Sequence, residues 1–408
     1  MLDTRFRGWR VTWAAFVVAV FGWGVGFYGP PVFLFAVQES RGWPVALVAA
    51  AVTCHFLCGA VIVANLPLIH ARFGIAGVTR LGGCLSGVGV LGWALAASPW
   101  QLFAATLVSG AGWAMTGGAA INAMISPWFQ RLRPAALGTA FNGASIGGVV
   151  FSPLWVALIG LLGFAGASAV IGGAMALVLW WLAGRYFAAG PAAYGQTPDG
   201  ETSPPASARV EPVHAALPGR ALWRNRRFST LAIATSLGLF AQVGLIAHLV
   251  SLLVTPMGAQ NAGLGAGLAT ICAVIGRTTL GWLLSAGGDR RIAAAANGAL
   301  QIAGSLAFLA SGGFDVTLLL LGIVLFGLGL GNVTSLPPMI AQRDFTPLDT
   351  ARVVALVTAC SQGAYAFAPA AFGLLRSVET GWIFVASALI QLAAALVFLA
   401  GRKSGHRK

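Results

Sequence analysis

Charge is scarce in this chain of 408 residues, of which only 8% are charged. Soluble domains carry about 25% charged residues. Together with a hydrophobic fraction of 58% and a mean hydropathy of +0.84, this scarcity excludes a soluble globular protein. The sequence G-x-x-x-x-G-K-[ST] is missing, so a P-loop ATPase is excluded as the energy source. No acidic pair falls near a shared predicted site, and we therefore predict no enzyme and no cofactor.

Cysteine is also rare, and all five cysteines fall within apolar segments. They do not have the pattern of a disulfide framework. Cys54 and Cys58 are one helical turn apart with His55 between them. This leaves two interpretations, a soft-metal or metalloid site and simple packing of buried thiols. Packing is the more common role, so we predict no metal site.

Long apolar segments are what the chain has in abundance. A membrane-spanning helix needs about 20 apolar residues. Twelve segments qualify, at 11–36, 45–69, 75–97, 100–124, 135–160, 164–187, 228–254, 262–285, 291–311, 314–340, 352–376 and 380–401. The first lacks a small-residue cleavage site, so we expect it to be retained. We predict an all-α membrane protein with twelve transmembrane helices.

Basic residues follow a membrane topology. With a cytoplasmic N-terminus, all 24 basic residues except Arg41, Arg277 and Arg376 fall in cytoplasmic segments. This distribution obeys the positive-inside rule. The net charge of +14 is therefore a topology signal, and nucleic-acid binding is not indicated. Arginine greatly outnumbers lysine, which is typical of a high-GC bacterial genome. We predict a multi-pass inner-membrane protein with both termini in the cytoplasm.

The second half of the sequence repeats the first. Residues 188–227 are rich in Pro, Ala, Gly and Ser and have no apolar period, so we predict a mobile cytoplasmic linker between residues 1–187 and 228–408. Three features recur at an offset of about 217 residues, namely Gly110 with Gly327, Arg72 with Arg290, and Gly147 with Gly363. This pattern predicts two pseudo-symmetric six-helix halves, with a binding site between them near the membrane midplane.

One charge lies inside an apolar run. Arg277 is the only ionisable side chain, cysteine aside, in residues 262–285, and about 12 Å of helix separates it from the end of that run. Such an arginine usually faces a protein interior or a watery cavity. One interpretation is structural, with the guanidinium bonded to backbone carbonyls or lining a pore. Because no acidic residue lies deep in a predicted span, we expect instead a small organic monoanion, its carboxylate bidentate on Arg277.

Four stretches carry a recognisable family pattern. They are Gly8-Trp9-Arg10-Val11 leading to Phe27-Tyr28-Gly29-Pro30; Trp128-Phe129 followed by Arg131, Arg133 and Ala136-Leu137-Gly138; His248-Leu249-Val250; and Gly276-Arg277 followed by Gly281 and Asp289-Arg290. In them the chain resembles the major facilitator superfamily, and more narrowly its monocarboxylate-transporter and oxalate/formate-antiporter branch. The resemblance implies that Arg277 anchors the substrate carboxylate. It also implies gating roles for the loop residues Arg72, Arg131, Asp289 and Arg290.

The chain departs from this family at several charged positions. Arg72 follows Ala71, where the family usually has an Asp-Arg pair. Proton-coupled animal members have a lysine where Val32 stands and an aspartate where Ala273 stands. Oxalate-type antiporters have a lysine near Gln362. These missing charges count against proton coupling by the family route and against dicarboxylate substrates.

Polar and aromatic residues near mid-depth complete the predicted site. Each has a plainer interpretation, as an interfacial aromatic for Tyr28 and as helix-to-helix bonds for the amides. Trp113 is expected to form the floor of a site for an apolar or aromatic acid. Beside Arg277, the predicted substrate contacts are Tyr28, Trp113, Gln242, Asn332, Gln362 and Tyr365.

The transported species and its coupling remain open at this stage. His55 and His248 are the intramembrane side chains that titrate nearest neutral pH, so they are the candidates for carrying a proton, with a structural role as the alternative. We predict a monomeric secondary carrier that moves a small organic anion, alone or with a proton, by rocking its halves in the bilayer. The alternatives are efflux of drugs, metalloids or other solutes, and a non-transporting receptor, which the short linker and tail disfavour.

Overall fold

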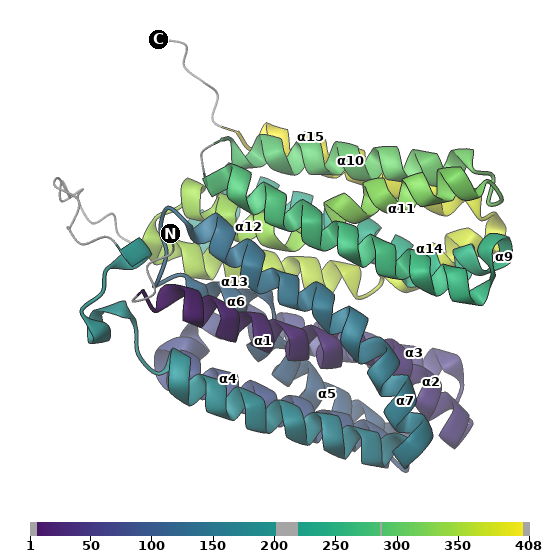
Figure 1. The fold of residues 1–408 in the computed structure, drawn as a ribbon, viewed down its shortest axis with the longest axis horizontal. Coiled ribbons are helices and arrows are strands. Elements are labelled where there is room, and N and C mark those ends of the chain that lie inside the picture. The colour runs from purple at the N-terminus through teal and green to yellow at the C-terminus, as the bar shows by residue number, and fades with distance from the viewer. Residues whose placement is uncertain (1–5, 201–218, 286–287, 403–408) are drawn as a thin grey trace, which may run out of the picture. The chain divides into compact units, whose positions relative to one another are not determined.

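The structure is a computed structural model that describes residues 6–200, 219–285 and 288–402. The chain divides into two compact units, Met1–Ala215 and Ala216–Lys408. Every regular element in the described residues is helical, and Figure 1 shows these elements in chain order. This confirms the all-α fold class.

The N-terminal unit contains seven α-helices among its described residues. They are α1 (Gly8–Gly26), α2 (Gly29–Arg41), α3 (Val45–Ala64), α4 (Leu66–Leu95), α5 (Pro99–Thr116), α6 (Gly118–Ile125) and α7 (Arg133–Leu182), which runs into a π-helical turn at Ala183–Phe187. Helix α1 packs on α7, α4 packs on α5 and α7, and α3 packs on α5.

The C-terminal unit repeats this plan with eight α-helices among its described residues. Its elements are α8 (Gly219–Arg224), α9 (Arg226–Ser285), α10 (Arg290–Ala310), α11 (Val316–Leu330), α12 (Asn332–Asp344), α13 (Pro347–Tyr365), α14 (Ala368–Val378) and α15 (Gly381–Ala400). Helix α9 packs on α11, α13 and α15, and α10 packs on α11 and α15.

Ten helical segments of the described residues are long and apolar enough to cross a membrane. One of them, Arg133–Phe187, has 55 residues and so is about 80 Å long, more than twice the thickness of the hydrocarbon core. The predicted span at 100–124 is divided between α5 and α6 by Gly117, which is not helical. With these two adjustments the ten segments agree with twelve crossings.

Glycines in left-handed conformations separate spans that run together as one helix. Gly163 lies inside α7 with φ 71°, and Gly258 lies inside α9 with φ 79°. Glycine adopts this region without the steric cost that a Cβ atom brings. Each therefore marks the sharp turn between two consecutive spans, near the predicted boundaries at 160–164 and 254–262.

Close contacts at glycine repeat between the halves. A Cβ atom on Gly110 of α5 would overlap the carbonyl of His55 on α3, and a Cβ atom on Gly327 of α11 would lie 2.9 Å from the carbonyl of Ala269 on α9. Small residues allow such close packing of membrane helices. The 217-residue repeat read in the sequence is thus also a repeat of backbone contacts.

The predicted linker contains regular structure at its two ends. Residues Pro191–Tyr194 and Pro198–Gly200 form 3₁₀ turns, and Gly219–Arg224 forms α8, while the mobility of the linker stays a prediction. The cause is local: the Asp199 carboxylate accepts hydrogen bonds from the backbone N–H groups of residues 130–132, at 2.7 to 3.2 Å. The part of the linker at 201–218 lies outside the described residues.

Candidate functional site

Four predicted spans are interrupted inside the membrane, and the predicted site residues gather at these breaks. The interruptions lie at residues 27–28 between α1 and α2, at Gly117 between α5 and α6, at Gly331 between α11 and α12, and at residues 366–367 between α13 and α14. Non-helical backbone at membrane depth is tolerated where it is buried in protein or lines a cavity. The breaks are therefore the natural places for solute contacts in each half.

Tyr28 lies at the break between α1 and α2. Pro30 and Pro31 begin α2 and lack backbone N–H groups, so they cannot continue the hydrogen bonding of α1. The Tyr28 N–H instead donates to the Trp23 carbonyl at 2.8 Å, five residues back. The Tyr28 ring is half-buried and lies against Gly148 of α7, where a Cβ atom would come within 2.6 Å of it.

Trp113 lies in the last turn of α5, close to the same break. Its ring meets Trp23 edge to face at 4.9 Å, and Phe27 lies between Tyr28 and Trp113, at 5.2 and 6.2 Å from their rings. Trp113 is only 4% exposed, and its Nε1 atom has no hydrogen-bond partner among the described residues. The structure thus brings the two predicted N-terminal contacts together around one aromatic cluster.

Arg277 lies on α9 at its closest approach to α11. A Cβ atom on the preceding Gly276 would overlap the Leu328 carbonyl, so the two backbones nearly touch. The Arg277 side chain is 4% exposed, and its Nε donates to the Gly331 carbonyl at 2.8 Å. A Cβ atom on Gly331 would lie 2.8 Å from that Nε, so a glycine is needed there. The guanidinium is fixed at the break between α11 and α12.

Asn332 follows this break and bonds within its own half. Its Nδ2 donates to the Asn297 Oδ1 at 2.8 Å, and the Asn297 Nδ2 donates to the Gly329 carbonyl at 3.0 Å. The Asn332 Oδ1 is buried without a partner among the described residues. Asn332 therefore ties α12 to α10, and its Oδ1 is an acceptor that no described residue uses.

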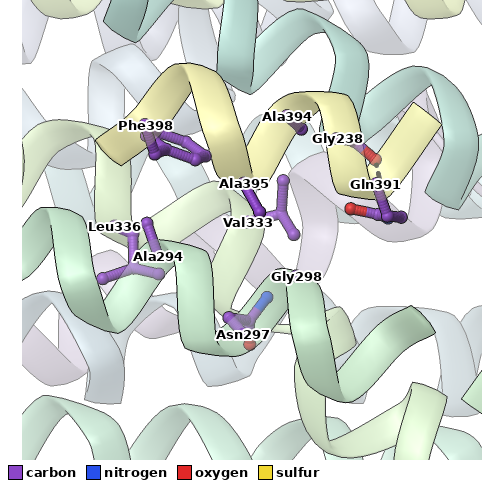
Figure 2. Close-up of a pocket in the computed structure, with 10 residues that line it drawn as sticks. All are labelled: Gly238, Ala294, Asn297, Gly298, Val333, Leu336, Gln391, Ala394, Ala395 and Phe398. Atoms are coloured by element: carbon purple, nitrogen blue, oxygen red, sulfur yellow. Dashed lines mark hydrogen bonds between the residues drawn. The ribbon is translucent and has the colours of Figure 1, made fainter. Parts of the chain in front are cut away.

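Gln242 belongs to a chain of three buried glutamines. Gln301 donates to the Gln242 Oε1 at 3.0 Å, and Gln391 donates to the Gln301 Oε1 at 2.5 Å. The chain joins α9, α10 and α15. Gln391 also reaches the Gly238 carbonyl in a small cavity, which Figure 2 shows together with Asn297. That cavity has a volume of about 10 Å³, which is room for one water and not for an organic anion.

Gln362 and Tyr365 lie together in the last turn of α13, and both side chains are buried. Pro369, at the start of α14, has no N–H group and ends the hydrogen bonding of α13 after Tyr365. The Nε2 atom of His248 on α9 lies 3.0 Å from the Pro369 carbonyl. These residues form a second group in the C-terminal half, at the break between α13 and α14.

His55 is fully hydrogen-bonded inside the N-terminal half. Its Nε2 lies 3.0 Å from the Gly26 carbonyl, and its Nδ1 lies 2.8 Å from the Ser109 hydroxyl. Cys58 donates to the Leu107 carbonyl at 3.3 Å. Within the described residues no three His, Cys, Asp or Glu side chains are grouped to hold a metal ion. Both ring nitrogens of His55 are thus already used by the protein.

The predicted loop residues differ in their surroundings. Arg72 is exposed and lies over the Phe73 ring, and Arg131 is exposed while its backbone N–H donates to Asp199. Arg290 donates to the Met339 carbonyl. Asp289 caps α10 by accepting from the N–H groups at 291 and 292 and pairs with Arg402 at 2.9 Å. Burial alone would raise the pKa of Asp289, but these donors outweigh it and hold the pKa below its usual value of 3.8.

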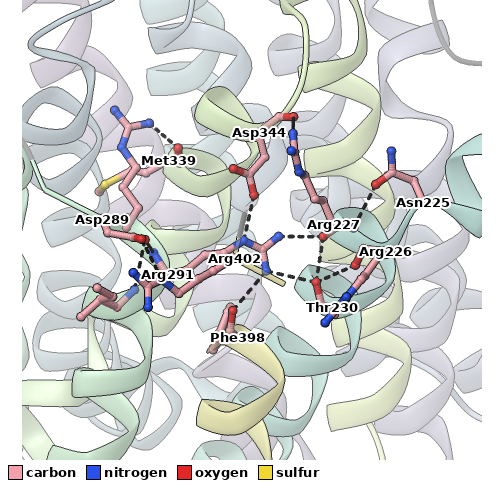
Figure 3. A network of polar contacts seen from close by, with 12 residues as sticks. Asn225, Arg226, Arg227, Thr230, Asp289, Arg291, Met339, Asp344, Phe398 and Arg402 are labelled. Carbon is pink, nitrogen blue, oxygen red and sulfur yellow. Dashed lines mark hydrogen bonds and ion pairs between the residues drawn. The ribbon is translucent and has the colours of Figure 1, made fainter. Parts of the chain in front are cut away.

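Sequence reasoning missed Arg291, which lies at the centre of the polar network in Figure 3. Its guanidinium is buried and donates to the Asp344 carboxylate at 2.8 Å, to the Thr230 hydroxyl at 3.1 Å and to the Arg227 carbonyl at 2.8 Å. Counting it only as one of many cytoplasmic arginines hid this role. The available signal was Asp344 at the end of α12, because in a membrane protein with so few acidic residues each one is expected to have a role.

Comparison with known proteins identifies the family. Residues 12–369 match the family model described as Major Facilitator Superfamily. The chain belongs to the major facilitator superfamily. It is therefore a multi-pass membrane transporter and not an enzyme.

A more specific similarity is to Monocarboxylate transporter 11 of Mus musculus, which is 28% identical over 298 residues. The match covers 69% of this chain and 60% of the mouse protein, so the chain spans about three fifths of that relative. This is a weaker relation than the family match.

Two solved structures share the fold over nearly the whole chain. The Escherichia coli fucose:proton symporter FucP superposes with a TM-score of 0.69 at 15% identity, covering 96% of this chain and 98% of that one. The human organic anion transporter MFSD10 (TETRAN) superposes with a TM-score of 0.67 at 16% identity, covering 97% and 100%. At these identities the likeness establishes the fold alone.

Proposed function

We propose that this major facilitator protein is a secondary carrier of small organic monoanions, with monocarboxylates as the main class. The observation that carries the proposal is Arg277, a buried arginine within a span, fixed at a helix break by its bond to Gly331. A charge at this depth is costly and is usually retained for a functional reason. The similarity to a monocarboxylate transporter supports the same substrate class.

The geometry suits a carboxylate. The Nε bond to the Gly331 carbonyl sets the plane of the guanidinium, and a planar guanidinium binds a carboxylate through two parallel hydrogen bonds. Asn332 directly follows Gly331 in the chain, and its buried Oδ1 is an acceptor for a hydroxyl or a protonated group. The other proposed contacts, Tyr28, Trp113, Gln362 and Tyr365, lie at the remaining breaks.

The distribution of arginine supports a cytoplasmic location for both termini. Arg72, Arg131, Arg290 and Arg402 lie at helix ends or in short connections on the side that the positive-inside rule assigns to the cytoplasm. We propose an inner-membrane protein in this orientation. Whether the anion moves alone, in exchange or with a proton is a separate question from the anchor.

A ligand-induced thermal shift tests the anchor. The purified protein is screened against acetate, propionate, lactate, pyruvate and benzoate, with propionamide as the uncharged partner of propionate. A ligand that binds the folded state raises Tm by mass action. We expect an acid, and not the amide, to raise Tm, and Arg277→Lys to weaken binding roughly ten- to a hundredfold because the fork of charged hydrogen bonds is lost.

The matched control is Arg220→Lys, at an exposed arginine of α8 outside the proposed site. We expect it to bind the same acid with unchanged affinity. If Arg277 has only a structural role, Arg277→Ala lowers the Tm of the ligand-free protein while the acid-induced shift survives. That result, or a wild type that responds to no acid, would contradict the proposed function.

A further inference from the structure

The two histidines inside the membrane share one arrangement, which the proposed transport activity does not by itself explain. In each case the Nε2 atom lies 3.0 Å from a backbone carbonyl at a broken span: His55 at Gly26, and His248 at Pro369. A carbonyl oxygen only accepts, so Nε2 must carry the proton and donate. Each imidazole is therefore a hydrogen-bond donor to the backbone beside an interrupted span.

The first break shows why donors are needed. Pro30 has no N–H and cannot donate to the Gly26 carbonyl four residues earlier. The Tyr28 N–H bonds to the Trp23 carbonyl, so the Gly24 carbonyl loses its usual partner as well. A buried carbonyl without a donor costs about 1 to 3 kcal/mol. His55 serves the Gly26 carbonyl, and the Trp155 Nε1 of α7 donates to the Gly24 carbonyl at 3.2 Å.

The rest of the His55 ring is held as a hydrogen-bond acceptor. Its Nδ1 lies 2.8 Å from the Ser109 hydroxyl, which itself accepts from the Trp93 Nε1 at 3.0 Å. A neutral imidazole with its proton on Nε2 satisfies both ring nitrogens at once. The ring is 1% exposed, so water does not compete for these bonds.

The second break differs from the first. The N–H groups at 366 and 367 bond back to the carbonyls of Gln362 and Ala364, and the chain then restarts as α14. Pro369 lies in the first turn of α14, so its carbonyl faces the N–H of Gly373 within the helix, and His248 adds a second donor from α9. A Cβ atom on Gly373 would lie 3.5 Å from the His248 ring, an ordinary van der Waals contact, so the ring packs against the first turn of α14.

We infer that His55 and His248 are positioning residues. They hold the broken backbones that carry Tyr28 and Tyr365, and they act as fixed N–H donors and not as carriers of a transported proton. The inference rests on the proposed function for its transport readout only. It assigns both histidines a role in presenting the two tyrosines to the solute.

The surroundings of both rings are consistent with a neutral donor. Helices α5, α11 and α15, which pack beside them, contain no Asp, Glu, Lys or Arg. The charged and titratable groups on the helices packed against α3 are Glu39, Arg41, His70, Arg72, Arg80 and Cys84, and α3 itself carries Cys54 and Cys58. Those on the helices packed against α9 are Arg220, Arg224, Arg343, Asp344, Asp349, Arg352, Cys360, Tyr365 and Arg376, and α9 itself carries Arg226, Arg227, Cys272 and Arg277. None of the hydrogen bonds described above joins either imidazole to a carboxylate.

Glutamine and leucine variants separate the two roles. His55→Gln and His248→Gln keep an N–H donor of similar reach but cannot take up a proton, whereas His55→Leu and His248→Leu remove the donor. Amide hydrogen exchange of the full-length protein, followed by mass spectrometry, reads the breaks without any substrate. We expect His55→Leu to speed exchange at 27–33 roughly fivefold to tenfold, as for one lost hydrogen bond, and to leave 366–373 unchanged.

His248→Leu should give the reverse pattern, so each variant is the control for the other. Trp155→Phe should act like His55→Leu, because it removes the donor to the Gly24 carbonyl. Both glutamine variants should keep wild-type exchange and an unchanged pH profile of solute uptake in proteoliposomes.

Two results would overturn the inference. Leucine variants with wild-type exchange at the breaks would show that the rings do not hold the backbone. Glutamine variants that lose the pH dependence of uptake would make the histidines proton carriers. If the wild type moves no carboxylate, the proposed function fails, and the exchange experiment still decides the positioning role.

Discussion

The two halves of this transporter hold their interrupted spans with different chemistry. In the N-terminal half, the carbonyls freed at the first break accept from neutral rings, His55 and Trp155. In the C-terminal half, the carbonyl at the Gly331 break accepts from the charged Arg277. The close backbone contact at Gly110 recurs at Gly327 in the other half, while the polar side chains do not recur. At these breaks the donors to the carbonyls are therefore neutral rings in the N-terminal half and a charged guanidinium in the C-terminal half.

The ends of the two halves that the linker joins differ as well. In the N-terminal half, Asp199 of the linker stabilises this end by accepting hydrogen bonds from three backbone N–H groups. In the C-terminal half, the buried ion pair of Arg291 and Asp344 stabilises the corresponding end. Breaking a backbone cap and breaking a buried ion pair have different costs, so substitutions can measure how far the halves have diverged.

The largest effect is expected at Arg291. Arg291→Met keeps the length and apolar stem of the side chain but leaves the Asp344 carboxylate without its partner. Removing one member of a buried ion pair costs about 3 to 5 kcal/mol, and we expect Tm to fall by roughly 10 °C. Thermal unfolding of the purified protein measures this change in Tm.

The control is Arg72→Met in the N-terminal half, where replacing an exposed arginine should change stability by less than about 0.5 kcal/mol. Equal losses of stability in the two variants would mean that the Arg291–Asp344 pair does not stabilise the C-terminal half.

A second comparison uses two glycines that are equivalent in the repeat. A Cβ atom on Gly147 would overlap the Val20 carbonyl, whereas one on Gly363 would meet nothing within 4 Å. Gly147→Ala should therefore lower stability by about 1 to 3 kcal/mol through overpacking. Gly363→Ala should be neutral or stabilise by up to about 1 kcal/mol, because alanine favours a helix. Similar Tm changes for both variants would show that the halves pack alike at this position.

The sequence predicted the elements better than it predicted the partners. The spans and the burial of Arg277 followed from hydropathy and the rarity of charge. The contrast between Gly147 and Gly363 did not, because both stand in the same motif and only the facing helix distinguishes them. Gln242 was predicted to contact substrate, but its partner Gln301 lies on another helix and was not recognised. The fold of the linker around Asp199 was likewise hidden, since one aspartate in a Pro- and Gly-rich segment gives no periodic signal.

The glutamine chain gives a third test, specific to the C-terminal half. Gln301→Leu removes the middle member and leaves the Gln242 Oε1 and the Gln391 Nε2 each without one partner. We expect a loss of about 1 to 2 kcal/mol, since hydrogen bonds between membrane helices are individually modest. Gln391→Leu should cost a similar amount, because it also removes two hydrogen bonds, one to the Gln301 Oε1 and one to the Gly238 carbonyl. If Gln242 holds substrate in preference to Gln301, Gln301→Leu would change solute affinity with little change in Tm.

The smallest effect is expected at Asp289, and it depends on pH. Asp289→Asn keeps a good N-cap for α10 but loses the charge that pairs with Arg402, a partly exposed bridge worth less than about 1 kcal/mol. Because the fold lowers the pKa of Asp289 below 3.8, its contribution is present above the unfolded pKa and is lost as the pH falls through the folded pKa. The Tm difference between wild type and Asp289→Asn should therefore be constant near neutral pH and shrink once the pH passes below 3.8.

In the other half, Asp199→Asn should cost more stability than Asp289→Asn at neutral pH. The Asp199 carboxylate uses both oxygens to accept from the backbone, and an amide has only one oxygen to offer. A larger loss of stability in Asp289→Asn would reverse this ranking and show that the salt bridge to Arg402 contributes more than the backbone bonds of Asp199.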